Sequence, residues 1–206
     1  MAASAEEIAE AIAALHAGEL VVFPTETFYG IAADPFSTSA LEKLCAIKGR
    51  DPQKPIALIA ADALMALHIA REVSAVARTL ANAFWPGPLT IVLPAREGLS
   101  VPLVGPDGGV GIRVSPHPIA MALTEGLRKP ITATSANRSG EEPATTLAMA
   151  RKSLGDKVKV YLDGGTLGAS APSTVVACDA SGYRIIRAGA ISEREIAAAL
   201  SAGATE

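Results

Sequence analysis

The basic side chains with the clearest potential for chemistry lie in short polar loops next to predicted strands. An arginine can pair bidentately with carboxylate or phosphate oxygens, and a lysine supplies a compact positive charge. The whole chain of 206 residues nevertheless has a net charge of −3. If the loops converge, they make a cationic cleft suited to a polyanion such as a nucleoside triphosphate. The cations concerned are Lys48, Arg50, Lys54, Arg113, Arg138 and Arg187.

The segment AIKGRDPQKP carries three of these cations, Lys48, Arg50 and Lys54, between a predicted helix and a predicted strand. One interpretation is a solvated helix C-terminus, where cations interact favourably with the helix dipole. The other interpretation is an anion site, in which the arginine fork matches phosphate oxygens and the lysines add charge. The segment by itself leaves both interpretations open.

The segment TSANRSG, residues 134–140, places small hydroxyl and amide side chains directly after a predicted strand. Short side chains let backbone N–H groups approach a ligand closely, and hydroxyl groups can donate to phosphate oxygens. A plain turn built from serine and asparagine is the alternative.

Two more arginines stand at the ends of predicted strands. Arg113 is the single cation in GVGIRVSPHP, and Arg187 precedes Ala188-Gly189-Ala190. An arginine in a strand often snorkels from a sheet edge, but one at a strand end could hold a carboxylate bidentately. The segment DGGTLGASAPSTVV, residues 163–176, is either a flexible connector or a loop that covers a ligand.

The segment VFPTETFYG, residues 22–30, leaves an apolar strand through two threonines and a glutamate and then returns to aromatic residues. An ordinary turn would favour Gly, Asn, Asp or Ser at these positions. The loop therefore carries side chains that can hydrogen-bond a ligand.

Several familiar catalytic patterns do not occur in the sequence. It contains no GxxxxGK[ST], GxGxxG, HExxH or GxSxG motif, and its three histidines are not spaced as a metal set. Cys45 and Cys178 also lack metal-ligand spacing, and both are predicted to be buried thiols in a reducing compartment. We therefore expect neither a dedicated metal cage nor a covalent nucleophile.

The composition is that of a globular protein, with 50% hydrophobic and 19% charged residues. We expect one domain over residues 1–206, with its core at about 5–202. Strand and helix patterns alternate irregularly, which predicts an α/β fold of the α+β type with a twisted, mixed parallel and antiparallel sheet flanked by helices. The strands are expected at 19–23, 56–60, 89–93, 110–114, 131–134, 158–162, 173–178 and 183–187, and the helices at 5–17, 38–48, 62–83 (two in succession), 116–127, 146–154 and from 192.

The N-terminal residues lack a basic region followed by an apolar stretch, so no secretory signal is predicted. No segment approaches the roughly 18 apolar residues that a membrane span needs. We expect a cytoplasmic protein that does not bind membranes.

The segments PTETFYG, KGR followed by KP, FWPGPLT, GIRVSPHP, TSANRSG, PSTVV and RAGAI occur in this order. The series resembles the YrdC/TsaC family, the L-threonylcarbamoyl-AMP synthases, from about Glu19 to Ile191. The resemblance includes the paired family signature KxR and SxN, here Lys48-Gly49-Arg50 and Ser135-Ala136-Asn137. It implies the short single-domain form and a fold with a deep, concave, basic cavity.

The resemblance implies a reaction in which L-threonine, bicarbonate or CO₂, and ATP give threonylcarbamoyl-AMP and pyrophosphate. The product would serve threonylcarbamoyladenosine modification of tRNAs that read codons beginning with A, through hand-over to a tRNA threonylcarbamoyl transferase complex. The expected cofactor is Mg²⁺ carried by ATP. The implied catalytic residues are Lys48 and Arg50, the ATP-binding residues Arg50, Lys54, Ser135, Asn137 and Arg187, and the threonine-binding residues Thr27, Lys48, Arg113 and Ser173.

Two positions depart from the pattern of the family. Some relatives have asparagine where this chain has Lys54, and RAGAI replaces a commoner RPG form, which leaves the loop after Arg187 less rigid. Two other functions remain open at this point: a related enzyme of the same fold that forms or hydrolyses a different carbamoyl-adenylate, and a double-stranded RNA-binding protein. The few aromatic residues, 4%, and the net acidity favour weak RNA binding at most.

Overall fold

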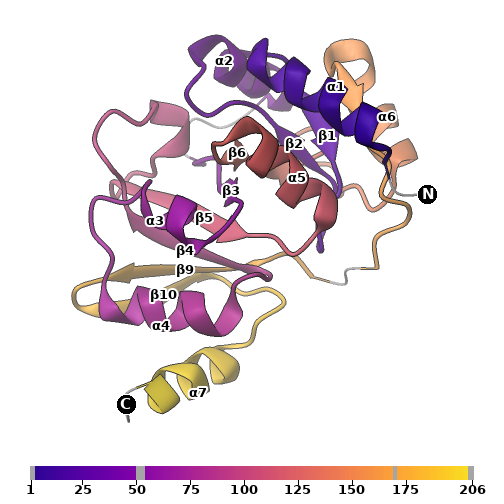
Figure 1. Cartoon of the computed structure of the whole chain (residues 1–206). Helices are drawn as coiled ribbons and strands as arrows, with labels where there is room; N and C mark the ends of the chain where they lie inside the picture. Colours follow the sequence, from indigo (N-terminus) through magenta and orange to yellow (C-terminus); the bar gives the residue numbers. More distant parts are fainter. Residues whose placement is uncertain (1–2, 50–53, 169–170, 204–206) are drawn as a thin grey trace.

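The strands of the chain belong to two sheets, which together organise the molecule (Figure 1). The computed structural model describes residues 3–49, 54–168 and 171–203. The larger sheet has the strand order β10-β9-β4-β5-β3-β6, and the smaller sheet has the order β7-β2-β1-β8. The strands of the larger sheet are β3 (Leu58–Ala60), β4 (Leu89–Pro94), β5 (Gly109–Val114), β6 (Ile131–Thr132), β9 (Thr174–Asp179) and β10 (Gly182–Arg187). Those of the smaller sheet are β1 (Val21–Phe23), β2 (Gly30–Ala32), β7 (Thr134–Ser135) and β8 (Val160–Tyr161).

Both sheets mix parallel and antiparallel pairs, as the irregular order of the elements predicts. In the larger sheet β3 runs parallel to β5 and β4 runs parallel to β9, whereas β4 and β5 are antiparallel. In the smaller sheet β1 is antiparallel to β2 and parallel to β8. The prediction of a mixed α/β fold is therefore confirmed. The sequence predicted one mixed sheet, whereas the structure divides the strands between two.

The helices begin and end at residues with clear capping chemistry. The side chain of Ser4 accepts from the backbone N–H of Glu7, whose carboxylate accepts from the backbone N–H of Ser4, which together form a capping box. The second helix ends at Lys48, because Gly49 adopts a left-handed conformation with φ of 54°. The helices are α1 (Ala5–His16), α2 (Thr38–Lys48), α3 (Ala63–Leu67), α4 (Ala75–Phe84), α5 (Pro118–Leu127), α6 (Leu147–Leu154) and α7 (Glu193–Gly203), with short 3₁₀ turns η1 (Val101–Leu103) and η2 (Gly155–Lys157).

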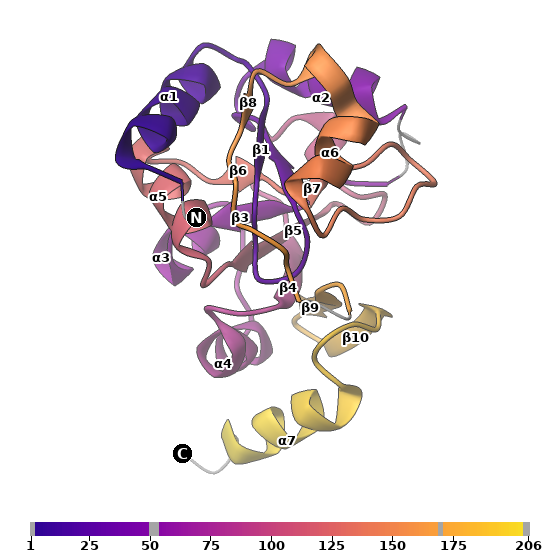
Figure 2. The ribbon, with the colours of Figure 1, turned by 90° about the vertical axis from the view of Figure 1, so that its right-hand side faces the viewer.

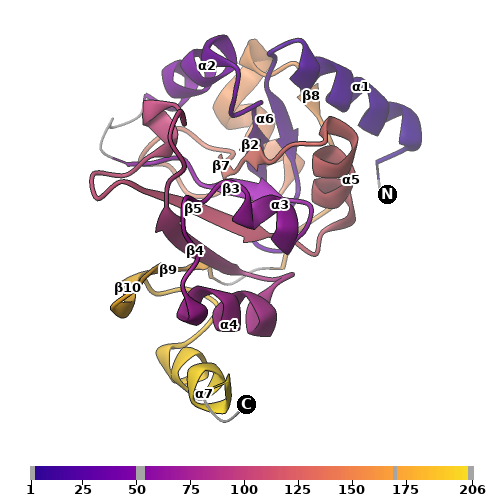
Figure 3. The ribbon, with the colours of Figure 1, turned by 60° about the vertical axis from the view of Figure 1, so that its left-hand side comes forward.

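Helices α3, α4 and α5 contact strands of the larger sheet, while α1 contacts β1 and β8 of the smaller one (Figure 3). The last helix, α7, packs on α4 next to β9 and β10, and Figure 2 shows this C-terminal part at the opposite end of the molecule from α1 and α2. None of the described helices is long and apolar enough to cross a bilayer.

Side-chain alternation on β5 separates the hydrophobic core from the opposite face of the larger sheet. Val110, Ile112 and Val114 are buried in the core cluster. Gly109, Gly111 and Arg113 are the intervening residues, and all three line a cavity. Helices α3 and α4 therefore cover the core face of this sheet, whereas the cavity lies on the other face, where α5 packs against Ile59 of β3.

Candidate active site

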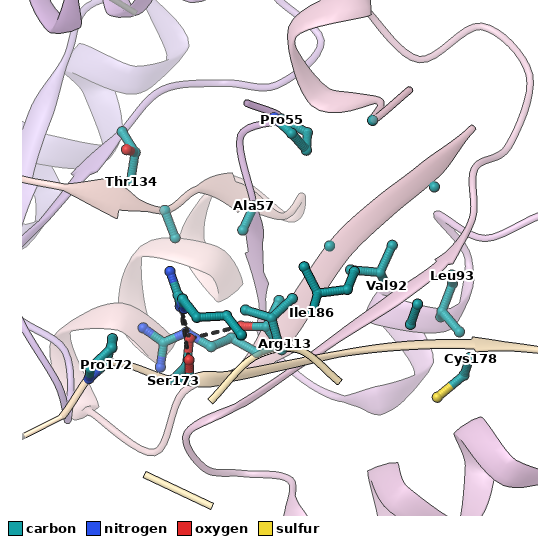
Figure 4. Close-up of a pocket in the computed structure, with 18 of the residues that line it drawn as sticks. Pro55, Ala57, Val92, Leu93, Arg113, Thr134, Pro172, Ser173, Cys178 and Ile186 are labelled. Atoms are coloured by element: carbon teal, nitrogen blue, oxygen red, sulfur yellow. Dashed lines mark hydrogen bonds between the residues drawn. The ribbon is translucent and has the colours of Figure 1, made fainter. Parts of the chain in front are cut away.

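A cavity of about 1080 Å³ lies against the face of the larger sheet that carries Gly109, Gly111 and Arg113 (Figure 4). Its walls include residues from all six of the polar or glycine-rich segments singled out in the sequence. Figure 4 shows Arg113 and Ser173 together at one end of the cavity, with Leu93 and Cys178 at the other. The lining includes Thr27, Tyr29, Thr90, Arg113, Ser135, Ser173 and Arg187.

Arg113 is buried in the interior of the sheet, since its strand is hydrogen-bonded to β3 on one side and β4 on the other. Its exposed fraction is 7%, and it lies opposite Ile59 of β3. The snorkelling interpretation of this arginine is therefore wrong, because the side chain is buried within the sheet and lines the cavity, and does not extend from a sheet edge into solvent.

Arg187 reaches the cavity because the pairing of β9 with β10 is irregular. The register of the two strands shifts between Ile185 and Arg187. Ile186 and Arg187 are neighbours in the chain, yet both line the cavity. A regular strand would turn neighbouring side chains to opposite faces, so the irregularity directs this arginine inward.

Ser173 lies at the centre of a hydrogen-bond cluster that joins three strands. Its hydroxyl lies 3.0 Å from Oγ1 of Thr90. Nη2 of Arg187 donates to both the carbonyl oxygen of Ser173, at 2.8 Å, and its Oγ, at 3.1 Å. The cluster fixes the start of β9 against β4 and β10, next to Arg113.

The electrostatics of Arg113 are set by burial and by two charged neighbours. Burial, followed by the charge of Arg187, lowers the pKa of Arg113 to about 10, so the guanidinium stays protonated at neutral pH. Nη1 of Arg113 forms an ion pair with Oε1 of Glu26. The carboxylate favours the charged guanidinium and acts against both of the other influences.

The PTETFYG segment forms the loop between β1 and β2, with both threonines buried in the cavity wall. The hydroxyl groups of Thr25 and Thr27 are 3.1 Å apart, and the Thr25 hydroxyl also donates to the carbonyl oxygen of Phe28 at 2.8 Å. Thr27 lines the cavity, as the sequence predicts for a residue that bonds a ligand. Both threonines therefore line the cavity, and Thr25 also holds the loop in place.

Tyr29 ties this loop to the DGGTLG segment. Its hydroxyl donates to the carbonyl oxygen of Gly165 at 2.7 Å and accepts from the backbone N–H of Gly164 at 2.9 Å. Burial raises the pKa of Tyr29, so the hydroxyl keeps its proton. The first part of residues 163–173 is thus anchored, while Pro172 and Ser173 at its far end line the cavity.

Lys48 holds the TSANRSG loop through hydrogen bonds to its backbone. Its side chain is buried, and Nζ donates to the carbonyl oxygens of Ser135, at 2.7 Å, and Asn137, at 2.5 Å. The backbone N–H of Ser139 in turn donates to the carbonyl oxygen of Lys48 at 3.2 Å. A solvated helix end does not describe this residue, because α2 delivers the ammonium group into the loop.

Asn137 is buried within the same loop and does not line the cavity. Its amide nitrogen donates to the carbonyl oxygens of Arg138, at 2.9 Å, and Glu141, at 2.8 Å. Its Oδ1 atom is buried without a hydrogen-bond partner in the described structure. Ser135, by contrast, lines the cavity.

Of the remaining predicted site residues, those that the structure describes do not line the cavity. Lys54 is exposed, and its neighbour Pro55 lines the cavity. Arg50 lies outside the described residues, so its predicted roles in catalysis and ATP binding stay predictions. Arg138 is exposed.

The sequence reading did not single out Glu26, Thr90 or Ser115 as site residues. Thr90 follows Leu89 in a strand whose apolar pattern gave no reason to single it out. Glu26 did carry a signal, because a carboxylate in an otherwise uncharged loop after a buried strand needs a partner. The partner, Arg113, is 87 residues away in the sequence and could not be assigned from it.

A profile of the Sua5, YciO and YrdC proteins, described as "Telomere recombination", matches residues 13–189 of the chain. The chain belongs to this family. Among its curated relatives, a putative threonylcarbamoyl-AMP synthase of Mycobacterium tuberculosis is 37% identical over 197 residues, which cover 96% of this chain and 90% of the relative. The threonylcarbamoyl-AMP synthase of Photobacterium profundum is 33% identical over 186 residues, which cover 89% of this chain and all of the relative.

Two solved structures of the Sua5/YciO/YrdC family share the fold. P. abyssi Sua5 in complex with L-threonine superposes with a TM-score of 0.89 at 33% identity, over 94% of this chain. The match covers 57% of that protein, so this chain spans a little over half of its length. E. coli YciO superposes with a TM-score of 0.83 at 25% identity, over 93% of both chains.

Proposed function

We propose that this chain is an L-threonylcarbamoyl-AMP synthase, which converts L-threonine, bicarbonate or CO₂, and ATP into threonylcarbamoyl-AMP and pyrophosphate. The observation that carries the proposal is the agreement in fold with a relative that binds L-threonine, with a TM-score of 0.89. The cavity supports it, since hydroxyl groups and two arginines of this chain converge at one end. The curated relatives named for this activity cover nearly the whole chain.

The threonine carboxylate would bind at the end of the cavity that holds Arg113 and Ser173. Arg113 is charged and buried, and a charge-assisted hydrogen bond gains strength where water is excluded. The hydroxyl of Thr27 is available on the same wall to bond the amino acid. Lys48 would act on threonine through the loop that it supports, and direct contact with substrate stays a prediction.

The triphosphate would lie along the TSANRSG loop near Arg187, with Lys54 and Arg50 as the further cations that the sequence predicts to bind ATP. Ser135 lines the cavity in support of this placement. Asn137 would contribute once its amide turns toward ATP, because Oδ1 now has no partner. ATP would enter with Mg²⁺ on its phosphates, as is usual for nucleotide-using enzymes.

The chemistry needs no covalent intermediate on the protein. The amine of threonine and bicarbonate give a carbamate and water, a carbamate oxygen attacks the α-phosphorus of ATP, and pyrophosphate leaves. The protein brings two anions together and stabilises charge in the transition state, which cations and hydroxyl groups achieve. The labile product would then pass to a tRNA threonylcarbamoyl transferase complex in the cytoplasm, and weak RNA binding near the cavity would assist this step.

The test is pyrophosphate release from ATP with Mg²⁺ and bicarbonate, with and without L-threonine, and with L-serine as the control. Release that depends on threonine supports the proposal. No release with either amino acid would contradict it and would direct the next assay to carbamoyl phosphate, the carbon donor expected for a related enzyme of the same fold.

A further inference from the structure

Glu26 has both carboxylate oxygens engaged by residues at the end of β5. Oε1 pairs with Nη1 of Arg113, and Oε2 accepts from the hydroxyl of Ser115. The side chain of Glu26 is 16% exposed, and Ser115 is 1% exposed. This short network links the loop between β1 and β2 to the strand that carries the cationic end of the cavity.

The carboxylate approaches Arg113 from outside the main cavity. Arg113 lines the cavity of about 1080 Å³, whereas Glu26 lines a separate hollow of about 370 Å³. Thr27 borders both spaces, so the loop between β1 and β2 forms the wall that divides them. Arg113 is thus paired with Glu26 on one side and lines the cavity on the other.

Arg113 needs such a partner for two physical reasons. An arginine side chain has many rotamers, and fixing one of them requires directional bonds. Its charge is also buried beside the charge of Arg187, an arrangement that is unfavourable without a nearby carboxylate. Glu26 supplies the neighbouring carboxylate, and its own bond to Ser115 limits where the paired guanidinium can lie. Within the described residues, the Arg113 side chain makes no other ion pair.

We propose that Glu26 is a positioning residue for amino-acid binding: through its ion pair with Arg113, and with Ser115 as its second anchor, it orients the guanidinium for the substrate α-carboxylate. This role rests on the proposed function. Glu26 itself does not touch the substrate. Its removal should therefore weaken threonine binding much more than ATP binding.

The experiment compares Glu26→Gln, Glu26→Asp and Ser115→Ala with the wild-type enzyme in steady-state kinetics. Gln keeps the size and loses the charge, so the KM for threonine should rise about tenfold or more, while the KM for ATP and kcat change less than threefold. Asp keeps the charge and should restore part of the loss. Ser115→Ala should give a smaller rise, and Glu10→Gln on the exposed surface of α1 is the matched control.

Whether the KM for threonine rises or falls in Glu26→Gln distinguishes a positioning role of Glu26 from simple neutralisation of the Arg113 charge. If Glu26 only neutralised Arg113, its replacement by Gln would leave a stronger cation, and threonine would bind more tightly. A lower or unchanged KM for threonine in Glu26→Gln would therefore overturn the proposal.

A double-mutant cycle tests whether Glu26 acts through Arg113. In an Arg113→Ala background, Glu26→Gln should cause no further rise in the KM for threonine. It should also raise the melting temperature of that variant, because Arg113→Ala leaves a buried carboxylate without its partner. A full additional loss of threonine affinity in the double variant would show that Glu26 acts independently and would contradict the proposal.

The two proposals fail in different ways. A wild-type protein that releases no pyrophosphate with threonine contradicts the proposed function and, with it, this role of Glu26. An active wild-type enzyme whose threonine KM does not respond to Glu26→Gln contradicts only the role of Glu26.

Discussion

Arg113 is the residue on which amino-acid recognition is expected to depend most. It is buried, charged, and placed beside Ser173 at one end of the cavity. A buried charged hydrogen bond contributes about 1.5–3 kcal/mol. We expect Arg113→Ala to raise the KM for threonine by roughly 10- to 150-fold and the KM for ATP much less. Steady-state kinetics measure both, with the exposed Arg78→Ala as the control, and a larger effect on ATP would place this residue on the nucleotide side.

Cys178 should be chemically inert in the folded protein. Burial raises the pKa of its thiol to about 12, and only 3% of the residue is exposed. Because the pKa is raised, the unreactive thiol predominates at all pH values below about 12, and the reactive thiolate is scarce at pH 8. In a Cys45→Ser variant, iodoacetamide at pH 8 should modify Cys178 at least ~100-fold more slowly in the native than in the urea-unfolded state, followed by mass spectrometry. Equal rates would contradict this environment.

At the scale of the elements, the loop after β10 is fixed by a close approach of two backbones. A Cβ atom on Gly189 would lie 2.3 Å from the carbonyl oxygen of Pro172 and 2.6 Å from the backbone of Ser173. The N–H of Ala190 also donates to that same carbonyl oxygen at 2.9 Å. The loop after Arg187 is therefore held by glycine packing, although it lacks the proline that the family pattern favours there.

We expect Gly189→Ala to displace Ser173 and the guanidinium of Arg187 bonded to it. Activity should fall at least about tenfold, and the protein should lose about 1–3 kcal/mol of unfolding free energy, as overpacking usually costs. Ala188→Ser changes an exposed neighbour in the same loop and serves as the control. Kinetics and urea denaturation measure the two effects, and a fully active, equally stable Gly189→Ala would show that the strands can move apart without cost.

At the scale of the whole molecule, α7 packs on α4 and contributes to the hydrophobic core. Ile196 is fully buried within the main core cluster, although most of its helix is exposed. We expect Ile196→Ala to lower the unfolding free energy by about 2–5 kcal/mol, because the truncation leaves a cavity. Arg194→Ala on the exposed side of α7 should change it by less than about 0.5 kcal/mol. Urea denaturation with a common m-value compares them, and equal stability of the two variants would mean that α7 is not part of the cooperative unit.

The positions and ends of several helices could be predicted from the sequence, because neighbouring residues determine them. The second helix was predicted at 38–48 and occupies Thr38–Lys48, because Ser37 caps its start and Gly49 ends it. The final helix was predicted to begin at 192, where the backbone N–H of Ser192 donates to the Glu195 carboxylate at 2.8 Å in a capping box. The pair of helices in 62–83 appears as α3 and α4.

Strand β2, Gly30–Ala32, was missed, since three residues after an aromatic pair show no alternation to detect. The segment 131–134 was predicted as one strand, but the structure has two there. Ile131–Thr132 pairs with β3 in the larger sheet, and Thr134–Ser135 pairs with β2 in the smaller one. Only strand partners, which lie far away in the chain, decide such a division.

The sequence by itself determined which residue types could do chemistry, which loops carry them, and which family they resemble. These properties depend on residue identity, local spacing and capping, and each is complete within a few consecutive residues. The tertiary structure alone decided the pairing of Glu26 with Arg113, the place of Lys48 beneath the TSANRSG loop, and the inward turn of Arg187. Each depends on strand register and on contacts between distant segments, and no local pattern contains that information.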